Sequence, residues 1–134
     1  MTEPAGLIEA VSPLDAKTTL DRLQAALSAA GVAVFGRIDH AAGASGAGLD
    51  LRPTTVLIYG NPQAGTRLMQ LDQRAGIDLP LKILVWTDEA NVTRVAYNDP
   101  TWIASRYGIT AENAPVLGAM KALVAGLIES LKEG

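Results

Sequence analysis

The sequence contains no cysteine and only one histidine, His40, among its 134 residues. Without thiols the chain cannot form disulfides, thiolate nucleophiles, or the cysteine-ligated sites that hold zinc and iron–sulfur clusters. A single imidazole excludes a metal site with several histidines inside one chain, and a Ser-His-Asp triad would have to use His40. The lack of cysteine leaves the redox compartment open.

Long runs of one charge and long apolar runs are also missing. Eleven basic and fourteen acidic side chains give a net charge of −3, and no Lys/Arg run could release counterions from a phosphate backbone, so we expect no nucleic-acid partner. The apolar stretch at residues 122–128 is far shorter than a membrane span. Residues 1–4 lack the basic and apolar regions of a signal peptide. We therefore expect a soluble, cytoplasmic protein with no membrane partner.

The composition that remains is that of a folded domain. Apolar residues make up 49% of the chain and charged residues 19%, which is ordinary for a globular core and unlike the composition of disordered chains. A chain of this length falls within the usual size range of one domain. We therefore expect residues 1–134 to form a single domain.

Apolar periodicity and cap signals predict the order of strands and helices. The predicted strands are residues 6–11, 32–38, 56–59, 81–86 and 92–97. Helices are predicted from Ser12-Pro13 to Gly31, from Asn61-Pro62 to about Gly76, from Asp99-Pro100 to Tyr107, and onward from Asn113 and Pro115. Residues 40–48 predict a loop or a weak Ala-rich helical turn, and residues 87–91 the loop of a hairpin.

This order predicts an α+β fold. The expected architecture is a two-layer sandwich in which helices pack on one face of a mostly antiparallel sheet. The first elements match the split β-α-β order, and a long C-terminal helix follows them. In that helix Gly118, Ala122 and Gly126 are spaced by four. This stripe predicts close packing on another helix or on the sheet, with a dimer seam or a ligand wall as the alternative.

Two glycine-rich segments resemble nucleotide-binding loops without meeting their requirements. Gly60 to Thr66 lies between a strand and a helix, but Thr66 stands where a Walker loop needs lysine. Gly43, Gly46 and Gly48 lack the strand-turn-helix context of a dinucleotide fingerprint. An Asn-capped helix explains the first segment, and its N-terminus could still hold another anion.

His40 is the residue around which a binding site is predicted. In the simpler interpretation it caps the turn after its strand or lies on the surface. In the functional interpretation it is a single metal ligand, and haem is the natural cofactor because one neutral imidazole suffices for a proximal bond. The sequence has no C-x-x-C-H motif, so such a haem would be non-covalent. Small residues that would admit a flat macrocycle follow directly: Ala41, Ala42, Gly43, Ala44 and Gly46.

Four blocks between Arg37 and Pro100 carry a family likeness: R-I-D-H-A-A, L-R-P-T-T-V-L-I-Y-G-N-P, D-L-P-L-K-I-L-V-W-T-D and V-A-Y-N-D-P. In this combination the chain resembles the domain of unknown function 302 (DUF302) family over roughly residues 6–108. The resemblance implies a small α+β domain that pairs as a dimer and has no agreed enzymatic activity. It implies no catalytic residues.

The resulting hypothesis is a small ligand-binding domain that holds haem through His40 in a homodimer. A two-fold axis could bring two copies of His40 to one site. The cofactor-binding residues are predicted to be His40, Ala41, Ala44, Arg52, Tyr59 and Trp86, and strand alternation places Lys82 on the same face as Trp86. Two alternatives stay open. One is a small-molecule enzyme with His40 or Lys82 as general base and Arg52 holding an anionic substrate. The other is a protein interaction module without a ligand.

Overall fold

A computed structural model describes residues 4–133. Residues 1–3, on which the expectation of no leader segment partly rests, lie outside the described residues. Five strands form one sheet in the order β1-β5-β4-β3-β2, and every neighbouring pair is antiparallel. The strands are β1 (Leu7–Ser12), β2 (Ala33–Asp39), β3 (Thr54–Gly60), β4 (Leu81–Thr87) and β5 (Thr93–Asn98). The predicted α+β class with an antiparallel sheet is therefore confirmed.

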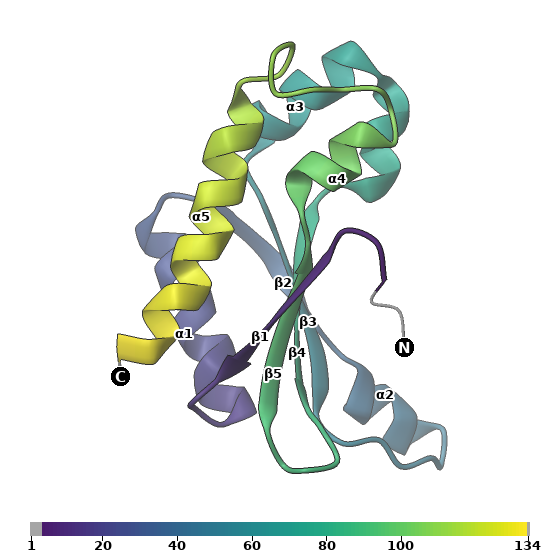
Figure 1. The fold of residues 1–134 in the computed structure, drawn as a ribbon. Helices are drawn as coiled ribbons and strands as arrows, with labels where there is room; N and C mark the ends of the chain where they lie inside the picture. The colour runs from purple at the N-terminus through teal and green to yellow at the C-terminus, as the bar shows by residue number, and fades with distance from the viewer. Residues whose placement is uncertain (1–3, 134) are drawn as a thin grey trace.

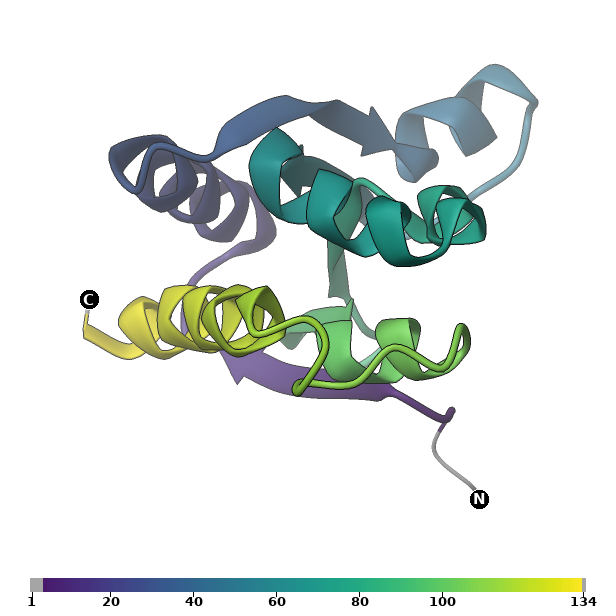
Figure 2. The same ribbon diagram turned by 90° about the horizontal axis from the view of Figure 1, so that it is seen from above.

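Helices form a second layer on one face of this sheet. In Figures 1 and 2, α1 and α5 lie on one side of the strands, and α3 and α4 lie beyond the end of the strands where α5 begins. The helices are α1 (Ala16–Ala29), α2 (His40–Gly46), α3 (Pro62–Leu71), α4 (Pro100–Ser105) and α5 (Val116–Ser130), with 3-10 turns η1 (Gln73–Asp78) and η2 (Leu131–Glu133). Strands β1 and β2, which α1 joins, are the two edges of the sheet with three strands between them, so the expected split β-α-β order is present.

The hydrophobic core lies between the sheet and these helices. Alternate residues of the three central strands point into it, because successive side chains of a strand point to opposite faces. They meet the apolar stripes of α1 and α5, where apolar residues recur every three or four positions. The core residues that are at most 1% exposed on these five elements are Leu23, Leu27, Leu57, Ile83, Val85, Val95, Leu117 and Val124.

The first helix begins later than its sequence predicts. Asp15, not Ser12, is the N-cap residue, and its carboxylate accepts a hydrogen bond of 2.7 Å from the Thr18 backbone N–H. The hydroxyl of Ser12 is instead 2.7 Å from that of buried Thr19. Ser12 satisfies a polar group inside the core, so its side chain does not cap the helix. Gly31 follows the helix at a φ of +75°, as its predicted role at the C-terminus requires.

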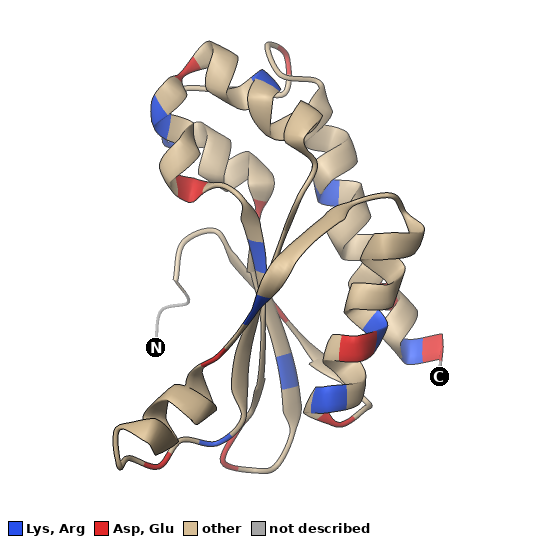
Figure 3. Cartoon of the chain, turned by 180° about the vertical axis from the view of Figure 1, so that it is seen from behind, with Lys and Arg blue, Asp and Glu red and all other residues tan. Residues whose placement is uncertain are grey.

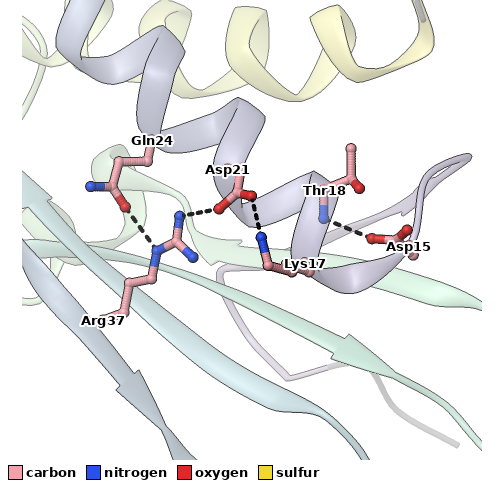
Figure 4. A network of polar contacts seen from close by, with 6 residues as sticks. All are labelled: Asp15, Lys17, Thr18, Asp21, Gln24 and Arg37. Carbon is pink, nitrogen blue, oxygen red and sulfur yellow. Dashed lines mark hydrogen bonds and ion pairs between the residues drawn. The ribbon is translucent and has the colours of Figure 1, made fainter.

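Charged side chains join α1 to the edge strand β2 (Figure 4). The guanidinium of Arg37 donates 2.8 Å and 2.9 Å hydrogen bonds to Gln24 and Asp21, and Lys17 pairs with the same aspartate at 3.0 Å. These contacts lie at the surface, so each contributes little to stability. They link α1 to β2 at the surface.

Three further helix boundaries agree only in part with those predicted from the sequence. Asn61 caps α3 with Pro62 at its first position, as predicted, but α3 ends at Leu71 and η1 continues toward Gly76. Asn113 does not cap α5, because its side-chain oxygen accepts from the Thr110 backbone N–H at 2.7 Å. The segment from His40 to Gly46 takes the helical alternative, and Asp39 caps it through a 2.9 Å hydrogen bond from the Ala42 N–H.

The small-residue stripe of α5 makes no close contact with other elements within residues 4–133. Gly118, Ala122 and Gly126 are all exposed, and a methyl group added at either glycine would meet no described atom within 4 Å. The prediction that another helix or the sheet packs closely on this stripe is therefore wrong.

Candidate functional site: an apolar sheet face beside His40

The face of the sheet that points away from α1 and α5 is mixed in character and forms the candidate site. We call it the open face. Its central row runs through paired positions of all five strands, and four of its five residues are apolar. The open face comprises Leu7, Glu9, Val11, Ile38, Thr54, Val56, Ile58, Lys82, Leu84, Trp86, Arg94, Ala96 and Asn98.

Helix α2 places His40 beside this face. It follows β2 directly, and in Figure 1 it projects on the side of the sheet opposite α1 and α5. Asp39 fixes the start of α2 through its capping hydrogen bond, so His40 occupies the first helical position next to the sheet. Figure 3 shows that α2 itself carries no Lys, Arg, Asp or Glu. An uncharged helix therefore flanks the open face.

A shallow depression of about 690 Å³ lies where His40 meets the open face. This volume is within the range of roughly 300–1,000 Å³ that is usual for small-ligand sites. Its floor is apolar, and the polar side chains lie around that floor. The lining residues are Pro4, Leu7, Glu9, His40, Val56, Lys82, Leu84, Trp86, Ala96, Tyr97 and Asn98.

Besides Tyr97, three ionisable side chains line the depression: Glu9, His40 and Lys82. None of them forms an ion pair with another residue in the range 4–133. Lys82 makes one long contact, 3.5 Å from its Nζ to the Pro80 carbonyl oxygen. An imidazole, an ammonium group and a carboxylate are thus available to a ligand above an apolar floor.

The remaining charge on the open face is neutralised within the chain. The Nε of Arg94 lies 2.6 Å from the carboxylate of Asp88, which also accepts hydrogen bonds from the backbone N–H groups of Val92 and Ala90. The Arg94 contact and these N–H groups hold the pKa of Asp88 below its usual range. Arg94 therefore serves the β4–β5 hairpin rather than a ligand.

The structure brings together some of the predicted site residues and separates others. His40, Lys82 and Trp86 line one depression. Ala41 and Ala44 lie on the less exposed side of α2 without lining it. Arg52 is well exposed outside the depression, with its Nη2 atom 3.9 Å from Glu89.

Tyr59, which the sequence analysis includes among the cofactor-binding residues, does not line the depression. It is 2% exposed and lies on the helix-covered face, where burial raises the pKa of its hydroxyl. Its neighbour Ile58 points to the open face instead, because strand positions alternate. Tyr59 therefore does not contribute to the depression.

Several lining residues were not predicted from the sequence, notably Leu7, Glu9 and Ala96. They belong to β1 and β5, which pair although almost ninety residues separate them along the chain, with Glu9 opposite Ala96. Alternation in β4 does indicate Leu84, which lies between Lys82 and Trp86 on the same face. No local signal indicates that β1 lies beside β5.

A two-layer α+β domain with one open sheet face is the class of protein that this structure defines. The chain belongs to the family described as "Domain of unknown function DUF302", whose model matches residues 8–127. This match begins near the start of the resemblance noted in the sequence and extends further, into α5. Within residues 4–133 no helix combines the length and hydrophobicity that crossing a bilayer requires.

Curated relatives match most of this chain, and a solved structure of the same family has the same fold. Proteins named "Fluoride-specific ion channel FluC 1" from Brucella suis and Brucella abortus are 40% identical over 122 residues, which is 91% of this chain but only 47% and 44% of theirs. The chain thus spans less than half the length of these relatives. The crystal structure of an uncharacterised DUF302 protein from Bacillus stearothermophilus superposes with a TM-score of 0.82 at 19% identity, covering 94% of this chain and 98% of that one. It shows the same fold.

Proposed function

We propose that this domain binds a flat, apolar small ligand on its open face, and that the ligand is haem held non-covalently through His40. The observation that carries the proposal is the position of His40. The only imidazole of the chain lines a depression whose floor is formed by apolar side chains, among them Val56, Leu84 and Trp86. A haem needs one axial nitrogen and an apolar surface for its ring. Lys82, which lines the same depression, would meet an anionic substituent of the ring.

The proposal includes a cytoplasmic homodimer. A macrocycle lying on a shallow face leaves its second side in water, which loses much of the hydrophobic gain of binding. Val11 and Ile38, on the open face, are 50% and 49% exposed in the single chain. A second copy related by a two-fold axis would cover both the ligand and these side chains and would bring a second His40 to the iron.

Hemin titration tests this function. We expect a sharp Soret band that survives desalting, with saturation at about one hemin per two chains if two copies of His40 share one iron. His40→Ala should abolish the band, and because His40 is exposed the variant should stay folded. Light scattering in the same samples should report a dimer.

A matched pair of variants separates the open face from general hydrophobic adsorption. Leu84→Glu places a charge on the floor of the depression, whereas Ile77→Glu places one at an 80% exposed position in η1. Only the first should weaken hemin binding, because a carboxylate under the ring must be desolvated. A Soret band unchanged in His40→Ala, or equal loss in both glutamate variants, would contradict the proposal.

A second candidate function is a small-molecule enzyme, and one observation favours it. The two candidate general bases, His40 and Lys82, line the same depression. Arg52 lies outside it, so Lys82 would have to hold an anionic substrate and His40 would be the base. Turnover of a panel of small esters and carbonyl compounds, lost in both His40→Ala and Lys82→Met, would support this function. Absence of turnover across the panel would argue against it.

A further inference from the structure

A second cavity of about 520 Å³ lies between α3 and the segment that leads into α5. Helices α3 and α5 contact each other, and Figure 1 shows α3 at the end of the molecule where α5 begins. The cavity shares no lining residue with the depression beside His40. Its polar lining consists of one arginine, Arg67, and four side-chain amides, and no acidic residue lines it.

Two of these amides have a fixed orientation. The Oδ1 atom of Asn61 accepts hydrogen bonds from the backbone N–H groups of Gln63 and Ala64, at 2.9 and 3.4 Å. The Oδ1 atom of Asn113 accepts from the Thr110 N–H at 2.7 Å and lies 3.2 Å from its hydroxyl. Because an amide has one oxygen and one NH₂ group, these contacts settle which end is which. Neither NH₂ group donates to another described residue, so each asparagine can donate to a ligand.

Arg67 adds positive charge to these donors. It forms no ion pair with any residue in the range 4–133. Its guanidinium carries five N–H donors in a planar fork that matches the two oxygens of a carboxylate or phosphate. A cavity rich in donors, positively charged and without a carboxylate selects an anionic acceptor.

The rest of the lining is apolar and includes Leu71 and Val116. An inorganic anion would leave this surface in water, whereas the carbon chain of an organic anion would cover it. The volume of the cavity is that of a small-molecule site.

We propose that this cavity binds a small organic anion, whose carboxylate or phosphate group is held by Arg67 and by the amides of Asn61 and Asn113. The carbon part of the ligand packs on Leu71 and Val116. This site is independent of haem binding at the open face, since the two share no residue.

Titration of ¹⁵N-labelled protein with hexanoate and with hexyl phosphate, at constant ionic strength, tests the proposal. We expect saturable shifts of the side-chain amide signals of Asn61 and Asn113 with at least one probe, and the two arms distinguish a carboxylate from a phosphate ligand. Arg67→Gln should weaken binding about tenfold or more, because it removes a charge-assisted hydrogen bond. Arg22→Gln is the matched control, since Arg22 is exposed on α1 and has no ion pair with a described residue.

Asn61→Asp is the sharpest variant. Aspartate caps a helix as well as asparagine does, so α3 should remain intact while the free NH₂ donor becomes a negatively charged oxygen. Asn113→Asp makes the same exchange and keeps the acceptor for Thr110. Both variants should bind the probe about tenfold or more weakly without a loss of thermal stability. Absence of saturable shifts with both probes, or equal weakening in Arg22→Gln, would overturn the proposal.

Discussion

At the scale of single residues, Gly6 is a position that cannot accept a methyl group. Its φ is +76°, and an added Cβ would overlap the ring of Trp102. Its carbonyl also accepts a 2.8 Å hydrogen bond from the Asp99 N–H, which holds β1 in place next to the start of α4. The backbone conformation and the nearby ring therefore both require glycine.

We expect Gly6→Ala to lower the free energy of unfolding by about 1–3 kcal/mol, because either the ring or the backbone must move. Chemical denaturation at neutral pH measures the change. Gly43→Ala is the control, since this glycine lies in α2 with nothing near its missing Cβ. An alanine there should be neutral or slightly stabilising. Equal destabilisation by both substitutions would show that Trp102 is not the cause.

Asp99 links α4 to α5 through its carboxylate. It accepts hydrogen bonds from the Thr101 backbone N–H and hydroxyl, at 2.9 and 2.6 Å, and lies 3.1 Å from the Nζ of Lys121. Burial alone would raise the pKa of Asp99, but these contacts outweigh burial and hold it below the ordinary value of 3.8. The ionised form is therefore the one that the fold stabilises.

This lowered pKa predicts a pH dependence of stability. The folded-state pKa lies below the unfolded-state value, so the contribution of Asp99 is fully present above about pH 4 and is lost as the pH falls through the folded-state pKa. Asp99→Asn keeps an acceptor for Thr101 but loses the ion pair, and we expect it to cost about 0.5–1 kcal/mol at pH 7. Urea unfolding of both proteins from pH 7 to pH 2 should show the difference shrinking below pH 4. A difference that stays constant would contradict this.

Residue types predicted part of the site. His40 was identified by being the only imidazole, and Trp86 and Lys82 by alternation along one strand. Tyr59 is among the predicted ligand-binding residues but lies on the covered face. Its strand is apolar on both sides, and such a strand gives no alternation from which to predict which face a residue occupies. Ser12 is predicted as a helix cap but pairs with a buried hydroxyl, because a cap and such a pair use the same residue type. Only tertiary contacts distinguish these cases.

At the scale of elements, α5 presents a row of small residues to solvent. Glycine inside an exposed helix lowers its stability, and neither Gly118 nor Gly126 has an atom nearby that would exclude a methyl group. We expect Gly118→Ala and Gly126→Ala each to stabilise the chain by about 0.5–1 kcal/mol. Thermal unfolding measures this. Destabilisation, or a change in mass by light scattering, would show that another chain packs closely on this stripe.

Helix boundaries were predictable where the cap is local in sequence. Asn61 followed by Pro62, and Asp99 followed by Pro100, both mark helix starts that the structure confirms. The start of α5 was predicted less well because it has no side-chain cap, and Asn113 instead closes a turn with Thr110. A cap residue in the sequence indicates that its side chain accepts a hydrogen bond from a nearby backbone N–H group. It does not indicate which N–H group is the donor.

At the scale of the whole molecule, the two-layer arrangement follows from the sequence and the open face does not. Alternating strands and amphipathic helices require one face of the sheet to be covered. Which strands are neighbours depends on long-range pairing. The first strand, β1, pairs with the last strand, β5. The depression includes residues from both of these strands. Local sequence patterns therefore could not predict that its residues lie together. The apolar central row of the open face, which no described helix covers, is the feature that only the structure reveals.

Adjacent residues of β4 test whether the open face is open in solution. Ile83 is fully buried under the helices, whereas Leu84 points to the other face and is partly exposed. In an isolated chain Ile83→Ala should cost about 2–5 kcal/mol, because it leaves a cavity in the core. Leu84→Ala should cost only about 1 kcal/mol, since water already reaches its side chain. Denaturation of both variants at several protein concentrations makes the comparison. If Leu84→Ala costs as much as Ile83→Ala, and its cost depends on concentration, a second copy covers the face. A small cost at every protein concentration would instead show that no second copy covers the face and that it is accessible to a ligand.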